Sequence, residues 1–99
     1  MIYMKITPNN ILCHELIGLE VKIEQYTDPS LVNVTGRVVD ETLKTLVIER
    51  EGGKRIRVFK ANGVFVFKTP DGREVTVVGE DIVGRPWDRL KKNIKKCWV

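Results

Sequence analysis

Few side chains in this sequence are of the types that perform covalent chemistry. The single histidine, His14, follows Cys13, and neighbouring residues on a helix point about 100° apart, so the two would not face each other. The acidic pairs Asp40–Glu41 and Glu80–Asp81 stand at the ends of expected elements, where carboxylates commonly cap or solvate turns. No glycine-rich phosphate-binding motif of nucleotide-binding proteins is present. We therefore expect no catalytic residue and a protein that is not an enzyme by itself.

The two cysteines, Cys13 and Cys97, lie near opposite ends of the chain. A zinc site needs about four nitrogen or sulfur ligands at recognisable spacing, and two cysteines with one histidine do not supply it. A disulfide between the ends is geometrically possible, but nothing indicates an oxidising compartment. We expect reduced thiols, no bound metal or cofactor, and a cytoplasmic protein.

Basic residues offer a different chemistry. Arg55 and Arg57 alternate with apolar residues, so both project from one face of a strand; Phe59 continues that face, and Lys60 falls on the other unless a bulge intervenes. The planar guanidinium group suits two-point contact with phosphate. Alternation alone predicts a solvated outer face of a sheet equally well.

Charge is unevenly distributed along the 99 residues. The net charge is +4, with a balance of −2 over residues 1–50 and +6 over residues 51–99. Clustered positive charge in a small domain is typical of a protein with a phosphate-rich partner. The alternative is a lysine-rich solubilising surface, such as that of a heat-adapted protein. No apolar run approaches the length of a membrane span.

The elements that must position these side chains are mainly short strands with a period of two. Turn residues separate them, and the gaps are too short for helices, which predicts an antiparallel sheet. Six strands at intervals of about ten residues favour a small closed or nearly closed barrel over residues 20–79. Gly36 predicts a kink or bulge in the second strand. The expected strands are Glu20–Tyr26, Val34–Asp40, Thr45–Arg50, Arg55–Lys60, Val64–Lys68 and Glu74–Gly79.

Helices are expected at both ends of a single domain spanning residues 1–99. The first covers residues 8–17, with Thr7 as N-cap and Gly18 as its stop. The second covers residues 86–97, begins at Pro86 and carries an apolar stripe opposite a lysine-rich face. Trp87 and Trp98 lie on that stripe, where we expect them to pack rather than to stack on bases.

Several strings, in register over residues 7–90, closely resemble the archaeal ribonuclease P protein component 1 family. They are Leu12–Leu19, Gly36–Thr42, Lys44–Leu46, Phe65–Phe67 with Pro70–Gly72, and Arg85–Arg89, which looks like an Arg-Pro-x-Asp-Arg signature. The resemblance implies an Sm-like antiparallel barrel with terminal helices. It also implies a non-catalytic subunit that assists the ribonuclease P RNA, which uses divalent metal to remove the 5′ leader of precursor tRNA. The implied partner is a small zinc-ribbon protein subunit.

Two surfaces are predicted from the residues themselves, one from the apolar stripe of the first helix and one from the positive charge of residues 51–99. Ile11, Leu12 and Leu16 are expected to contact the partner protein, with burial in the core as the alternative. The phosphate-binding surface is expected to comprise Arg37, Lys44, Lys54, Arg55, Arg57, Lys60, Lys68, Arg73, Arg85, Arg89 and Lys92.

Two other functional classes remain open. A protein-recognition module of the Tudor or SH3 kind would need a surface aromatic cage, which Tyr26, Phe59 and the tryptophans could supply. A ring-forming Sm-type RNA binder would be an oligomer, whereas we expect a monomer.

Overall fold

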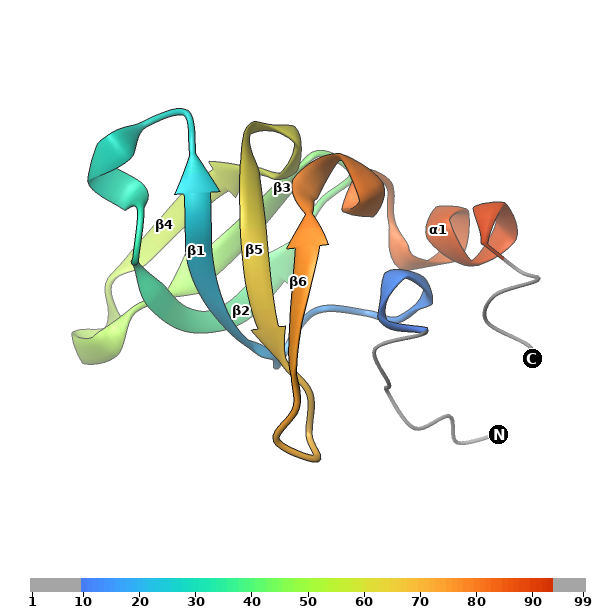
Figure 1. The fold of residues 1–99 in the computed structure, drawn as a ribbon, viewed down its shortest axis with the longest axis horizontal. Helices are drawn as coiled ribbons and strands as arrows, with labels where there is room; N and C mark the ends of the chain where they lie inside the picture. Colours follow the sequence, from blue (N-terminus) through green and yellow to red (C-terminus); the bar gives the residue numbers. More distant parts are fainter. Residues whose placement is uncertain (1–9, 94–99) are drawn as a thin grey trace.

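The computed structural model describes residues 10–93, in which six strands form one antiparallel sheet (Figure 1). The predicted mainly β class is confirmed, and each strand matches its predicted range to within one residue at either end. The strands follow the order β4-β3-β2-β1-β5-β6 across the sheet. They are β1 (Glu20–Tyr26), β2 (Thr35–Glu41), β3 (Thr45–Glu49), β4 (Arg55–Phe59), β5 (Gly63–Lys68) and β6 (Glu74–Val78).

The sheet curls so that its two halves share one core. Figure 1 shows β2, β3 and β4 crossing behind β1, β5 and β6. Alternate side chains from both halves point into the space between them and form one buried cluster, including Val38, Ile48 and Val58 from one half and Phe65 and Phe67 from the other. Burial of these apolar faces is the main force that holds the halves together.

The sheet is not closed, so the predicted Sm-like barrel is not confirmed. Within residues 10–93, β4 and β6 are its two edges and have no pairing with each other. One end is bridged instead by two short 3-10 helices, η4 (Lys60–Asn62) and η5 (Gly79–Ile82). They approach so closely that a Cβ atom on Gly79 would lie 1.6 Å from the carbonyl oxygen of Lys60.

The predicted bulge at Gly36 is wrong in position. Gly36 pairs regularly with Val21, and the irregularity between β2 and β3 falls later, between Val38 and Asp40. A Cβ atom at Gly36 would lie 2.4 Å from the carbonyl oxygen of Glu49. The residue is therefore small because the neighbouring strand passes close to it.

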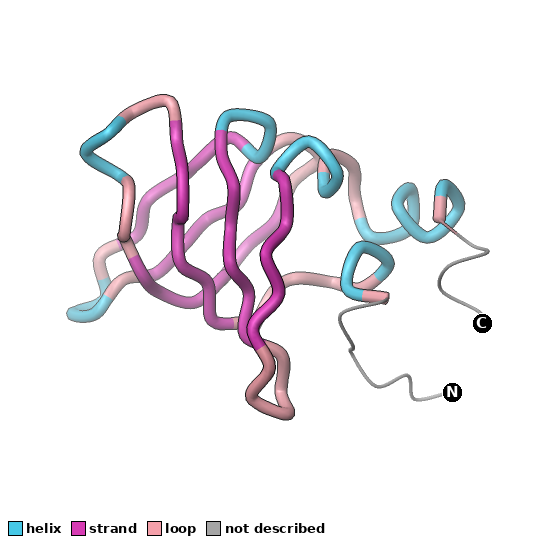
Figure 2. Tube along the Cα trace, viewed as in Figure 1, coloured by secondary structure: helices cyan, strands magenta, loops and turns pink. Residues whose placement is uncertain are grey.

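The N-terminal helix is not confirmed within the described residues. Only the 3-10 turn η1 (Ile11–Cys13) forms there (Figure 2), and residues 8 and 9 lie outside the described range. An α-helix would pair the amide of Leu16 with the carbonyl of Leu12, but that amide donates to Glu41 Oε1 at 3.3 Å. The Gly18 amide likewise donates to the carbonyl of Val38, in β2. Long-range partners thus replace the helical hydrogen bonds.

At the C-terminal side, helix α1 (Pro86–Lys92) begins at Pro86 as predicted, and residues 94–97 of the predicted helix lie outside the described range. Two further 3-10 turns connect strands, η2 (Pro29–Leu31) and η3 (Glu51–Gly53). The expectation of a reduced thiol is wrong for Cys13, which is disulfide-bonded. No helix in residues 10–93 is long and apolar enough to cross a membrane.

Candidate nucleic-acid interface

Six charged residues alternate in sign along one row across the outer face of the sheet. Each is the Cα partner of the next on the neighbouring strand, so opposite charges face each other from β4 to β6. We call this row the charge ladder; it comprises Arg55, Glu49, Arg37, Glu20, Lys68 and Glu74.

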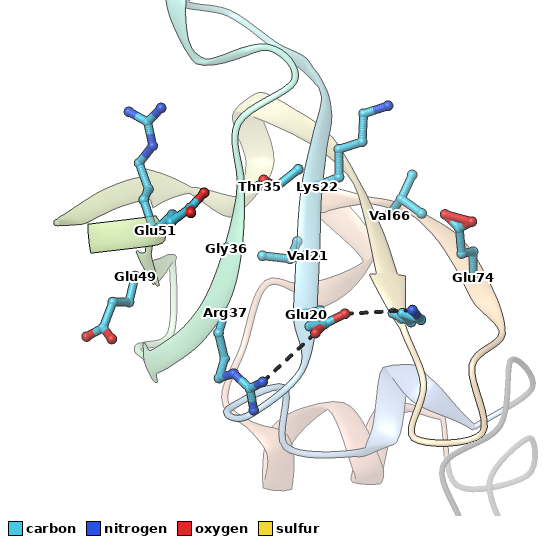
Figure 3. A pocket seen from close by; sticks show the side chains of 12 residues that line it. Glu20, Val21, Lys22, Thr35, Gly36, Arg37, Glu49, Glu51, Val66 and Glu74 are labelled. Atoms are coloured by element: carbon cyan, nitrogen blue, oxygen red, sulfur yellow. Dashed lines mark ion pairs between the residues drawn. The ribbon is translucent and has the colours of Figure 1, made fainter. Parts of the chain in front are cut away.

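Ion pairs within the charge ladder neutralise three of the predicted phosphate-binding cations. Arg55 Nε lies 2.9 Å from Glu49 Oε2. Glu20 lies between two cations, with its carboxylate 3.9 Å from Arg37 and 4.0 Å from Lys68, and Figure 3 shows its pair with Arg37. Five of the six ladder residues, all except Arg55, line a shallow groove of about 620 Å³, whose balanced charge gives a phosphate little net attraction.

Three exposed cations without such partners lie on the edge strand β4 and beyond its two ends. Arg57 is exposed and stands opposite the uncharged Val47. Lys54 is exposed in the turn before β4, and Lys44 is exposed next to the far end of that strand, where its carbonyl accepts from the amide of Lys60 at 2.9 Å. Within the described residues these three have no ion pair; we call them the β4-edge cations.

Two predicted phosphate-binding residues, Lys60 and Arg89, are in fact buried, with 0% and 1% exposure. Both contact the same carboxylate: Lys60 Nζ donates to Glu41 Oε2 at 2.8 Å, and Arg89 Nη1 donates to the same oxygen. The Glu41 side chain is itself 1% exposed. The prediction is therefore wrong for Lys60 and Arg89, which with Glu41 form what we call the buried ionic cluster.

Backbone carbonyls balance the second positive charge of the buried ionic cluster. Lys60 Nζ donates to the carbonyls of Thr42 at 2.8 Å and Gly84 at 2.9 Å. Arg89 donates to the carbonyls of Leu12 and His14, at 2.8 Å and 2.6 Å. Burial lowers the pKa of the Lys60 ammonium group, and the hydrogen bond and charge of Glu41 oppose that shift.

The buried ionic cluster explains the Arg-Pro-x-Asp-Arg string structurally. The amide of Arg85 donates to Asp88 Oδ2 at 3.3 Å, which fixes the first turn of α1 after Pro86. Arg89 then points inward, to the segment around η1 and to Glu41 of β2. This cation therefore joins segments far apart in the chain and is not available to an external phosphate.

The remaining predicted cations lie elsewhere. Arg73 is in the β5–β6 hairpin, 3.3 Å from Asp71. Arg85 and Lys92 are exposed at the two ends of α1, and neither forms an ion pair within the described residues. The predicted set is therefore divided among the charge ladder, the β4 edge, the hairpin, α1 and the interior, rather than gathered on one surface.

The prediction for the protein-partner surface is also corrected. Ile11 and Leu16 are 1% and 0% exposed and belong to the core, while Leu12 is half-buried against it. Phe59 continues the exposed face of Arg55 and Arg57 on β4, as the alternation predicted, and its side chain remains 53% accessible there.

Known proteins are similar to this chain over most of its length. A sequence model of the family described as ribonuclease P/MRP, subunit p29, matches residues 9–92. A ribonuclease P protein component 1 from Desulfurococcus amylolyticus is 60% identical, over 89% of this chain and 96% of that protein. Its counterpart from Staphylothermus marinus is 54% identical, over 93% of this chain and 100% of that protein.

A solved structure agrees with these matches. It is that of Mth11, described as a homologue of the human RNase P protein Rpp29, and it superposes with a TM-score of 0.57 at 46% identity. The superposition covers 77% of this chain and 97% of Mth11. Identity at this level across most of both chains shows common descent, and the chain belongs to the ribonuclease P/MRP subunit p29 family.

Proposed function

We propose that this protein is a non-catalytic RNA-binding subunit of ribonuclease P, supporting RNA-catalysed removal of the 5′ leader from precursor tRNA. The match of residues 9–92 to the ribonuclease P/MRP subunit family carries this proposal. In it, the divalent metal belongs to the RNA and this chain binds no cofactor. The protein acts in the cytoplasm, is a monomer when isolated, and associates with the ribonuclease P RNA and a zinc-ribbon protein subunit.

The phosphate contacts of this proposal lie on the β4-edge cations. Arg57, Lys54 and Lys44 are exposed and have no carboxylate partner within the described residues, so they can bind an external anion without breaking an ion pair. Arg55 and Arg37 of the charge ladder already face carboxylates. Arg85 and Lys92 on α1 are a second exposed group that a large RNA could reach.

A filter-binding titration against the ribonuclease P RNA tests this placement. Affinity should fall steeply with salt, because each neutralised phosphate releases counterions. Arg57→Ala should weaken binding at low salt and make the log–log salt slope shallower by about 0.7–0.9, the value for one lost phosphate contact.

The matched control is the exchange Glu49→Arg with Arg55→Glu, which keeps the net charge and the cross-strand ion pair of the charge ladder. We expect the exchanged protein to bind RNA with the wild-type slope. An unchanged slope for Arg57→Ala, or an equal loss in the exchanged protein, would contradict the placement on the β4 edge.

The mass of the isolated protein in solution separates this proposal from a ring-forming RNA binder. β4 and β6 are the edges of the sheet within the described residues, and a ring of copies would have to pair or cover them. A monomeric mass supports the proposed subunit, and a stable ring would contradict it.

A further inference from the structure

A hollow of about 340 Å³ lies beside the exposed ring of Phe59, away from the charge ladder. Its walls come from three separated parts of the chain: the turn before β3, the end of β4 with the adjoining η4, and the segment that follows η5. The lining residues are Lys44, Phe59, Ala61, Asn62 and Val83.

Phe59 supplies an aromatic surface on a fixed backbone. Its amide donates to Tyr26 Oη at 2.9 Å, and its Cα pairs with that of Thr45 across β3 and β4. The side chain nevertheless remains 53% exposed. A positioned, solvent-facing aromatic ring is the feature on which single-stranded nucleic-acid binders stack bases.

The polar groups around the ring are those that a nucleotide requires. Asn62 is exposed, its backbone carbonyl accepts from the amide of Thr27 at 3.1 Å, and its side-chain amide makes no hydrogen bond within the described residues. That amide offers two donors and one acceptor to the edge of a base. Lys44 adds a positive charge without an ion-pair partner, and no carboxylate lines the hollow.

We propose that this hollow is a subsite for one unpaired nucleotide of the bound RNA. The base stacks on Phe59, Asn62 contacts its polar edge, and Lys44 contacts its phosphate. Arg57 lies two residues before Phe59 on the same strand face, about 7 Å away along the strand, where it reaches an adjacent phosphate. The subsite rests on the proposed function, because it needs an RNA to be bound.

Phe59→Leu tests the subsite because it keeps an apolar side chain and removes the aromatic face. Affinity for the ribonuclease P RNA should fall by about 5- to 150-fold, the range expected for one lost base stack. The salt slope should not change, because stacking releases no counterions, whereas Lys44→Ala should make the slope shallower. Phe59→Trp should retain near wild-type affinity.

Val78→Ala is the matched control, since Val78 is 51% exposed on the other edge strand and should not affect binding. Thermal unfolding of each variant checks that it folds, and ultraviolet cross-linking of the wild-type complex with peptide mapping should place a cross-link at Phe59. Wild-type affinity in Phe59→Leu, or a loss that Phe59→Trp shares, would overturn the subsite.

The outcomes separate this subsite from the proposed function. Steep salt-dependent binding by the wild type together with unchanged binding by Phe59→Leu would remove the subsite alone. Absence of RNA binding by the wild type would remove both. If Phe59→Leu instead weakened the capture of a protein subunit with RNA affinity intact, the hollow would be a protein contact and the nucleotide assignment wrong.

Discussion

Replacing Glu41 by glutamine removes the carboxylate of the buried ionic cluster while nearly preserving side-chain shape. In the wild type Glu41 accepts hydrogen bonds from Lys60 and Arg89, and from the amide of Leu16. In Glu41→Gln the two cations share the same interior without an anion. Removing one partner of a buried ionic group typically costs about 3–5 kcal/mol, because an uncompensated charge is left behind. A small domain has only about 5–15 kcal/mol in total.

Glu49→Gln is the matched control for this prediction. It makes the same chemical change at the exposed pair with Arg55, which has a similar distance of 2.9 Å but side chains that are 37% and 64% exposed. Solvent screens such a pair, so the expected loss is below about 1 kcal/mol. Urea unfolding followed by circular dichroism measures both free energies without adding salt.

A second substitution tests whether the unpaired charge is the cause. Adding Lys60→Met to Glu41→Gln restores the net charge of +1 that the cluster has in the wild type. The double variant should therefore lose less than the sum of the two single losses, by about 0.5–3 kcal/mol. Strict additivity, or equal losses in Glu41→Gln and Glu49→Gln, would refute the electrostatic account of the cluster.

Three further predictions concern the packing around that cluster. The folded pKa of Lys60 lies below its unfolded value of 10.5, so its contribution to stability rises as the pH increases toward 10.5 and is lost as the pH falls through the folded pKa. The stability difference between wild type and Lys60→Met should show that rise in alkaline urea titrations, and a pH-independent difference would contradict it. Gly79→Ala should destabilise by about 1–3 kcal/mol or more, because the new Cβ meets the backbone oxygen of Lys60, and an unchanged urea midpoint would refute this close approach. Tyr26→Phe should cost about 0.5–1.5 kcal/mol by removing the acceptor for the amide of Phe59, and a neutral result in the same assay would show that water replaces it.

The strands could be predicted from sequence because each carries its own local signal. Alternating apolar residues such as Leu46 and Ile48 fix which face of β3 is buried, and turn residues such as Gly52 and Gly72, at φ values of 87° and 88°, mark the reversals. Closure of the sheet has no comparable local signal. It depends on how far the two halves curl, which no single strand encodes.

The buried cations could not be predicted, because their burial depends on distant partners. Lys60 ends an alternating strand and Arg89 lies among other charges on α1, so both resemble solvated residues. Their common acceptor, Glu41, is 19 and 48 residues away in sequence. Arg89 also donates to the carbonyls of Leu12 and His14, and in an α-helix the carbonyl of Leu12 would instead accept from the amide of Leu16.

The candidate interface could be predicted only in part, because strand alternation is a local signal and cross-strand register is not. Strand alternation correctly placed Arg55 and Arg57 on one exposed face. It could not show that Arg55 faces Glu49 while Arg57 faces Val47, because that difference depends on the register between β3 and β4. The surface of the C-terminal half is less positive than its sequence predicts, because two of its basic residues, Lys60 and Arg89, are buried beside Glu41.

Reconstitution of precursor-tRNA cleavage tests the central claim most directly. The ribonuclease P RNA and its other protein subunits are assayed at limiting magnesium, with and without this protein, alongside the protein alone. We predict faster removal of the 5′ leader when the protein is present and no cleavage by the protein alone. An identical rate without it, or hydrolysis by the isolated chain, would contradict the account.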